Sequence, residues 1–110
     1  MTAESISESA TVGPAPSRLR ARPLSSTSVS LQWNDASLGR ARRIVDNRYY
    51  NIHYEAGAGG RTMSVIVKDL GVVLHDLDPG TRYEFKVRTV KDGLTSPFSD
   101  VVTAWTLDQS

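Results

Sequence analysis

The amino-acid sequence predicts an all-β domain, a sandwich of two antiparallel sheets built from seven short strands. First, apolar and polar residues alternate in seven short runs, as they do in half-buried strands. Second, the breaks between these runs carry glycine, proline or aspartate, which are the residues of tight turns. Third, no window of helical length keeps a 3.6-residue period, and the short spacing leaves no room for the long crossovers of parallel strands.

Each predicted strand is identified by apolar residues that share one face. The seven sets are Leu19 and Ala21; Val29, Leu31 and Trp33; Tyr50, Ile52 and Tyr54; Met63, Val65 and Val67; Val72 and Leu74; Tyr83, Phe85 and Val87; and Val102, Ala104 and Thr106. Because successive strand residues point to opposite faces, these sets predict the inward-facing side chains. The core is expected to contain Trp33, Tyr50, Ile52, Tyr54, Leu77, Tyr83, Phe85 and Val87.

The chain has 110 residues, which is room for one domain. Residues 1–16 are rich in Ser, Ala, Thr and Pro and are expected to be a disordered linker or leader, because they bury too little apolar surface to offset their ordering entropy. The domain is expected over residues 17–107, with residues 108–110 as a tail.

Charge is unevenly distributed along the chain. Between Ser17 and Leu107, thirteen basic residues stand against nine acidic ones, because Glu4, Glu8 and Asp108 lie outside this range. Ten of the thirteen are arginine, whose guanidinium group bonds carboxylates and sulfates bidentately. The chain has no cysteine, which excludes a disulfide scaffold and a thiolate metal site.

The motifs in the predicted strands, taken in order, resemble a fibronectin type III domain. They are Trp33 near the end of the second strand, the run Tyr50-x-Ile52-x-Tyr54, the signature Leu77-Asp-Pro79-Gly-Thr-x-Tyr83-x-Phe85-x-Val87, and Ser96-Pro-Phe-Ser99 before the last strand. The resemblance implies an immunoglobulin-like sandwich with a tyrosine corner. In such a corner the hydroxyl of Tyr83 would reach back to the backbone a few residues upstream.

A narrower resemblance joins the stretch Trp33-Asn-Asp-Ala-Ser-Leu-Gly with Ile44-Val-Asp-Asn-Arg-Tyr-Tyr. Together they are similar to a membrane-proximal fibronectin domain of netrin receptors, the deleted-in-colorectal-cancer, neogenin and frazzled class. This implies a domain on the extracellular face of the plasma membrane, in a single-pass protein, or alternatively a secreted one. The implied partners are a netrin-like or repulsive-guidance ligand, heparan sulfate and neighbouring fibronectin-type domains, with the isolated domain monomeric.

The candidate ligand-binding residues are mostly basic. Arg40, Arg42 and Arg43 lie in a long loop, Arg48 follows at the strand entry, and Lys91 lies in a second loop expected at the same pole. Loops on a rigid scaffold commonly carry binding residues. The hypothesis is that this pole binds an acidic protein surface or a sulfated polysaccharide; the alternative is a solvated loop whose charges only maintain solubility.

Trp105 is the remaining candidate, because the alternation of the last strand points it outward. Two interpretations stay open: it is a contact residue for a partner, or Lys86 or Arg88 covers it through a cation–π contact. The first strand is expected at a sheet edge, and its arginines Arg18, Arg20 and Arg22 are expected to block pairing with other strands.

No catalytic function is expected. His53 and His75 lie on different predicted strands, and neither has carboxylates at metal-ligand spacing. No cofactor or metal is expected, and the few aromatic residues look committed to the core rather than to nucleic-acid stacking. The sequence therefore predicts a protein-recognition module of a multidomain receptor. The alternatives are a structural spacer between modules and an accessory domain of an enzyme.

Overall fold

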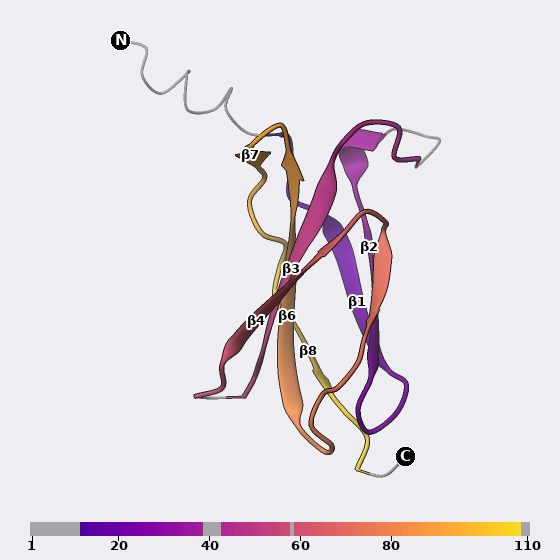
Figure 1. The fold of residues 1–110 in the computed structure, drawn as a ribbon, viewed down its shortest axis with the longest axis vertical. Coiled ribbons are helices and arrows are strands. Elements are labelled where there is room, and N and C mark those ends of the chain that lie inside the picture. Colours follow the sequence, from indigo (N-terminus) through magenta and orange to yellow (C-terminus); the bar gives the residue numbers. More distant parts are fainter. Residues whose placement is uncertain (1–11, 39–42, 58, 109–110) are drawn as a thin grey trace.

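The computed structural model describes residues 12–38, 43–57 and 59–108. Within these residues the chain forms eight strands and one short 3-10 helix, drawn in Figure 1. The strands are β1 (Ser17–Pro23), β2 (Val29–Asn34), β3 (Tyr49–Ala56), β4 (Thr62–Val67), β5 (Gly71–Leu74), β6 (Arg82–Lys91), β7 (Leu94–Thr95) and β8 (Val102–Trp105), and the helix is η1 (Ala36–Leu38).

The strands form two antiparallel sheets, which confirms the predicted all-β sandwich. One sheet has the order β1-β2-β5, and the other has the order β4-β3-β6-β7, with β8 also pairing with β6. The chain crosses between sheets from β2 to β3 and from β4 to β5, so neighbouring strands in space are often distant in sequence (Figure 1).

The sheets enclose a core made of their inward-facing side chains. Tyr50, Ile52, Phe85 and Val87 are fully buried, and Trp33 is 2% exposed. The rings of Trp33 and Tyr50 meet edge to face with centroids 5.6 Å apart, the arrangement that aromatic quadrupoles favour. Of the other residues expected in the core, Leu77 and Tyr83 are buried, and Tyr54 is half-buried at its margin.

The turn before β6 is a tyrosine corner. The backbone N–H of Asp78 donates a hydrogen bond of 2.8 Å to the hydroxyl oxygen of Tyr83. Thr106 joins the end of the chain to the same corner, because its hydroxyl donates to the carbonyl oxygen of Asp78 at 2.6 Å and accepts from the N–H of Thr81 at 2.9 Å. Gly80 lies in this turn at φ 56°, a left-handed conformation that glycine adopts at little cost.

The last predicted run forms β8, and a further strand that the sequence did not predict, the two-residue β7, precedes it. Pro97 lies between the two strands, where its lack of an N–H prevents a continuous ladder. Two serine side chains take over the bonding across the gap. The N–H of Thr89 donates to Ser96 Oγ at 2.9 Å, and the N–H of Val87 donates to Ser99 Oγ at 3.1 Å.

Candidate functional site

The segment between β2 and β3 meets the β6–β7 turn at one pole of the sandwich. The side-chain amide of Asn47 donates a hydrogen bond of 2.8 Å to Asp92 Oδ1, and Lys91 Nζ lies 3.5 Å from Asp46 Oδ2. The shared pole expected from the sequence is therefore present. Arg43 is exposed there, whereas Arg40 and Arg42 lie outside the described residues.

Arg48 lies inside the protein, whereas a ligand-binding residue is expected to be exposed. It is buried, and its guanidinium group spans two carboxylates: Nη1 lies 2.8 Å from Asp35 Oδ2, and Nε lies 2.9 Å from Asp46 Oδ1. A second bond from Nη2 to Asp46 Oδ2 completes a bidentate fork. Because these partners occupy its donors, Arg48 fastens the loop to the sandwich and presents no charge to a ligand.

The carboxylate of Asp35 is the buried centre of this network. It accepts hydrogen bonds from the hydroxyl of Ser37 at 2.6 Å and from the hydroxyl of Tyr50 at 2.7 Å, besides that from Arg48. Burial alone would raise the pKa of Asp35, but these hydrogen bonds outweigh it and lower that pKa. Burial and the bond to Asp35 raise the pKa of Tyr50, so its proton stays in place.

The hydrogen bonds from Arg48 lower the pKa of Asp46, and the bonds to Asp46 in turn raise the pKa of Arg48. Asp35 and Asp46 thus stay ionised and Tyr50 stays protonated around neutral pH. With these charges paired, the network acts as a structural clamp between the loop and the sandwich.

The outer face of the five-stranded sheet carries the second candidate surface. Phe98 comes from the irregular segment before β8 and packs over this face. Lys86 Nζ lies 4.5 Å from the centre of its ring, Arg88 Cζ lies 4.7 Å from it, and the His53 ring centroid is 4.8 Å away. The cation–π contact that the sequence suggests for Trp105 is therefore found at Phe98. The alternation of residues along β6 does not indicate which aromatic ring Lys86 and Arg88 contact.

Trp105 lies on the same outer face at the end of β8. It is 59% exposed and directly opposite Arg82 in the β6–β8 ladder. The guanidinium group of Arg82 instead forms an ion pair with Glu84, with 2.6 Å between Nη2 and Oε2. The cation–π contacts among the described residues lie over Phe98, which leaves the indole ring of Trp105 open to solvent.

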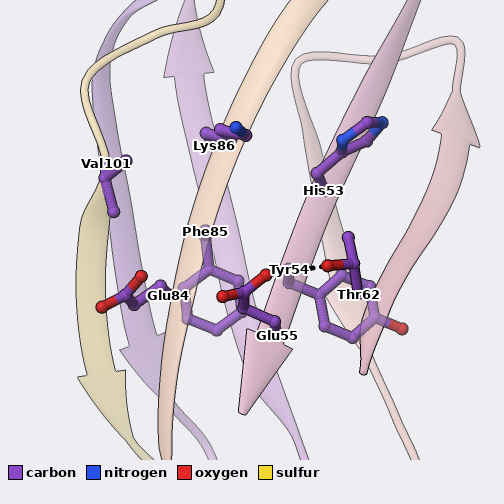
Figure 2. A pocket seen from close by; sticks show the side chains of 8 residues that line it. All are labelled: His53, Tyr54, Glu55, Thr62, Glu84, Phe85, Lys86 and Val101. Atoms are coloured by element: carbon purple, nitrogen blue, oxygen red, sulfur yellow. Dashed lines mark hydrogen bonds between the residues drawn. The ribbon is translucent and has the colours of Figure 1, made fainter. Parts of the chain in front are cut away.

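A shallow hollow of about 150 Å³ lies beside this surface (Figure 2). Glu55 and Glu84 face each other across it, and Thr62 donates a hydrogen bond of 2.8 Å to Glu55. Pockets that enclose a small-molecule ligand usually exceed about 300 Å³. The hollow therefore suits one side chain of a partner better than a small substrate.

The described residues contain no cluster of three or more His, Asp or Glu side chains placed to hold a metal ion. His53 stacks on Phe98, and its burial, followed by the charges of Arg88 and Lys86, lowers its pKa below the ordinary 6.5. His75 is exposed just after β5. In the same described residues, no helix is long and apolar enough to cross a membrane.

Sequence comparison finds similarity to neogenin from three mammals. Neogenin from Homo sapiens is 29% identical over 86 residues, and neogenin from Rattus norvegicus and Mus musculus match equally. The match covers 76% of this chain but only 6% of human neogenin. The chain thus spans one small part of that relative's length.

Solved structures with the same fold are numerous. The FN5 domain of Drosophila Lar has a TM-score of 0.68 at 24% identity, with 87% of this chain and 98% of that one covered. The fn3 domain of human contactin 1 has a TM-score of 0.68 at 23% identity, covering 89% and 81%. The FN3 domain of human collagen XX has a TM-score of 0.69 at 25% identity, covering 87% and 94%.

The sequence profile of the fibronectin type III domain matches residues 14–105. This range contains both sheets and the tyrosine corner, and the expected family resemblance is confirmed. The chain belongs to the fibronectin type III domain family.

Proposed function

We propose that this chain is a non-catalytic recognition module in the extracellular part of a multidomain cell-surface receptor, where it binds a protein ligand. Fibronectin type III domains are typically non-catalytic modules, and the sequence likeness is to one small part of neogenin. The chain enters beside β7 at one pole and leaves after β8 at the opposite pole, which suits modules joined in series (Figure 1). A secreted protein is the alternative setting.

The proposed contact surface is the Trp105 face, which we define as Arg82, Lys86, Arg88, Phe98 and Trp105. The single observation that carries this proposal is the exposure of Trp105 on a strand of the five-stranded sheet. Tryptophan and arginine are enriched among residues that dominate binding energy. The cations of Lys86 and Arg88, which stack on Phe98 farther along the same face, favour an acidic partner surface.

The resemblance to netrin receptors suggests a netrin-like or repulsive-guidance ligand. The experiment is to replace Trp105→Ala in the receptor ectodomain and to measure affinity for both ligand classes by surface plasmon resonance. Loss of a central aromatic contact is expected to weaken binding of one class about thirtyfold. Val73→Ala, which truncates an exposed apolar side chain on β5 of the other sheet, is the matched control. Unchanged affinity for both ligands in the Trp105 variant would contradict the proposal.

Heparan sulfate is the second proposed ligand, and the arginine pole is its proposed site. Arg43 is exposed there, so the pole offers a cation beyond Arg48 and Lys91, which lie close to Asp46. Replacing Arg40, Arg42 and Arg43 together by Glu is expected to lower the salt concentration at which the domain elutes from a heparin column.

The control for this experiment reverses the same number of charges elsewhere, by replacing Arg18, Arg20 and Arg22 on β1 with Glu. A pole-specific site requires a larger shift for the pole variant than for the β1 variant. Equal shifts would show that heparin responds only to net charge, and no shift would show no binding at the pole.

A further inference from the structure

The outer face of the five-stranded sheet has its charged side chains in rows, because residues of one face on β3 and β6 lie directly opposite each other. His53 lies opposite Lys86, and Glu55 lies opposite Glu84. Successive rows are two residues apart along each strand, which is about 7 Å. Figure 2 shows Lys86 and His53 toward one end of the hollow and the two glutamates toward the other. The face is therefore divided into a basic part and an acidic part.

The two glutamates of the acidic part have partners other than the neighbouring basic row. Glu84 Oε2 lies 2.6 Å from Nη2 of Arg82, and Glu55 accepts a hydrogen bond of 2.8 Å from Thr62. Within the described residues, neither carboxylate forms an ion pair with Lys86. The acidic part therefore does not neutralise the basic part.

The basic part is built around the ring of Phe98, and we call His53, Lys86, Arg88 and Phe98 the Phe98 cluster. Lys86 Nζ lies 4.5 Å and Arg88 Cζ 4.7 Å from the centre of this ring. Neither cation has a carboxylate partner in the part of the chain that the structure describes, and the buried Nε of Arg88 has no hydrogen-bond partner there. Two cations that share one ring without a counter-charge repel each other, and an anion bound to both would offset this repulsion.

The Phe98 cluster suits a single carboxylate better than a polyanion. An extended sulfated chain that crossed the face would meet the row of Glu55 and Glu84 and be repelled by it. An acidic side chain on a protein surface can place one carboxylate on the cluster without meeting that row. The guanidinium fork of Arg88 matches the geometry of a carboxylate. Stacking on Phe98 restricts both cations before binding, which reduces the entropy that binding costs.

Resting on the recognition function proposed above, we propose that the Phe98 cluster binds the carboxylate of one Asp or Glu side chain of the protein ligand. Lys86 and Arg88 donate the hydrogen bonds, and His53 contributes a third positive charge when it is protonated. The Phe98 cluster thereby assigns a particular chemical group to the acidic partner surface.

His53 makes this binding depend on pH. Its burial and the charges of Arg88 and Lys86 lower its pKa, and a bound carboxylate raises that pKa again. By linkage, the protonated imidazole binds the carboxylate more tightly. Affinity is expected to rise about threefold from pH 8 to pH 5. The other groups on the elements around His53 are Glu55 on β3, Glu84 on β6, Ser64 on β4 and Asp100 in the segment that carries Phe98.

The test is an NMR titration of the whole chain with N-acetylglutamate α-amide, which carries one carboxylate, at constant ionic strength. Up to about 200 mM of this probe is expected to give saturable shifts of the His53 and Arg88 side-chain signals and to raise the pKa of His53. Replacing Lys86 and Arg88 together by Gln is expected to weaken binding about tenfold. Retained signals of the buried Phe85 ring would show that this variant folds.

The control replaces Arg20 and Arg22 on β1 by Gln, which removes the same number of charges from the other sheet and is expected to leave the affinity unchanged. Equal weakening in the two variants, or no saturable shift in the unaltered chain, would overturn the proposal. A heparin tetrasaccharide is expected to shift the signals of Arg43 at the pole first. Earlier shifts at the Phe98 cluster would indicate a sulfated polysaccharide there and would also overturn it.

This titration and the Trp105→Ala experiment can fail independently. The probe has no group for Trp105 to contact, so a negative titration leaves the effect of Trp105→Ala on the protein ligands to be measured. Conversely, unchanged ligand affinity in the Trp105 variant would remove the proposed contact surface, while a carboxylate site at the Phe98 cluster would still be detected by the probe.

Discussion

Arg48 is a charged residue placed where apolar residues usually lie. Its guanidinium group has 9% of its side-chain surface exposed and holds two carboxylates of the loop that follows β2. Removing one partner of a buried pair leaves the other charge without compensation, which costs about 3 kcal/mol or more. We therefore expect Arg48→Ala to lower the free energy of unfolding by about 3 kcal/mol.

Urea denaturation followed by tryptophan fluorescence measures this loss. Arg43→Ala is the matched control, because Arg43 is an exposed arginine of the same loop. Its expected effect is within about 0.5 kcal/mol. If both variants unfolded at the same urea concentration, the clamp would contribute nothing to stability.

The pKa of Asp35 gives the clamp a defined pH dependence. This pKa lies below its ordinary value of 3.8 in the folded chain, so the unfolded chain binds the proton more readily. The stability from ionised Asp35 is fully present above about pH 4 and is lost as the pH falls through the folded-state pKa. We expect Asp35→Asn to be less stable at pH 7 and to lose less stability between pH 4 and pH 2. Parallel urea-midpoint curves for the two chains would contradict this assignment.

At the scale of single elements, the junction between β7 and β8 depends on two serines. Ser99 Oγ accepts the N–H of Val87, while the Ser99 N–H donates to the Val87 carbonyl oxygen at 2.8 Å. Ser99→Ala would leave the Val87 N–H buried without a partner, at a cost of about 1–3 kcal/mol. Ser64→Ala, on the exposed face of β4, is the control and is expected to cost little. Thermal unfolding that shifts equally in both variants would refute this role of Ser99.

Strands with a clear alternation of apolar and polar residues were predictable, because burial of one strand face imposes that alternation on the sequence. The inward sets of β2, β3 and β6 follow directly from alternation, whereas the tyrosine corner was implied by the resemblance of the segment from Leu77 to Tyr83 to the family's motif. The irregular segments carry no period. The burial of Arg48 depends on Asp35, thirteen positions away, and the stacking of Lys86 on Phe98 depends on the path around Pro97. Such contacts are set by the assembled fold.

At the scale of the whole molecule, two roles, a spacer and a recognition module, require different features of the sandwich. A spacer needs only the path of the chain from one pole to the other, which any domain of this fold supplies. A recognition module needs particular side chains on its outer face, loops or edges. The FN3 domain of collagen XX shares the fold with a TM-score of 0.69 but only 25% of the sequence. It therefore keeps the backbone fold, while most of its aligned residues differ from those of this chain.

Exchanging this chain for the collagen XX domain within a receptor ectodomain distinguishes the two roles. We expect the chimera to lose ligand affinity by about thirtyfold, the effect expected for Trp105→Ala, because the Trp105 face is lost while the spacing is kept. Grafting Arg82, Lys86, Arg88, Phe98 and Trp105 onto the chimera at the equivalent positions is expected to restore part of the affinity, as measured by surface plasmon resonance. A chimera that binds as tightly as the native ectodomain would make this domain a spacer, because spacing would then be all that the ligand requires of it.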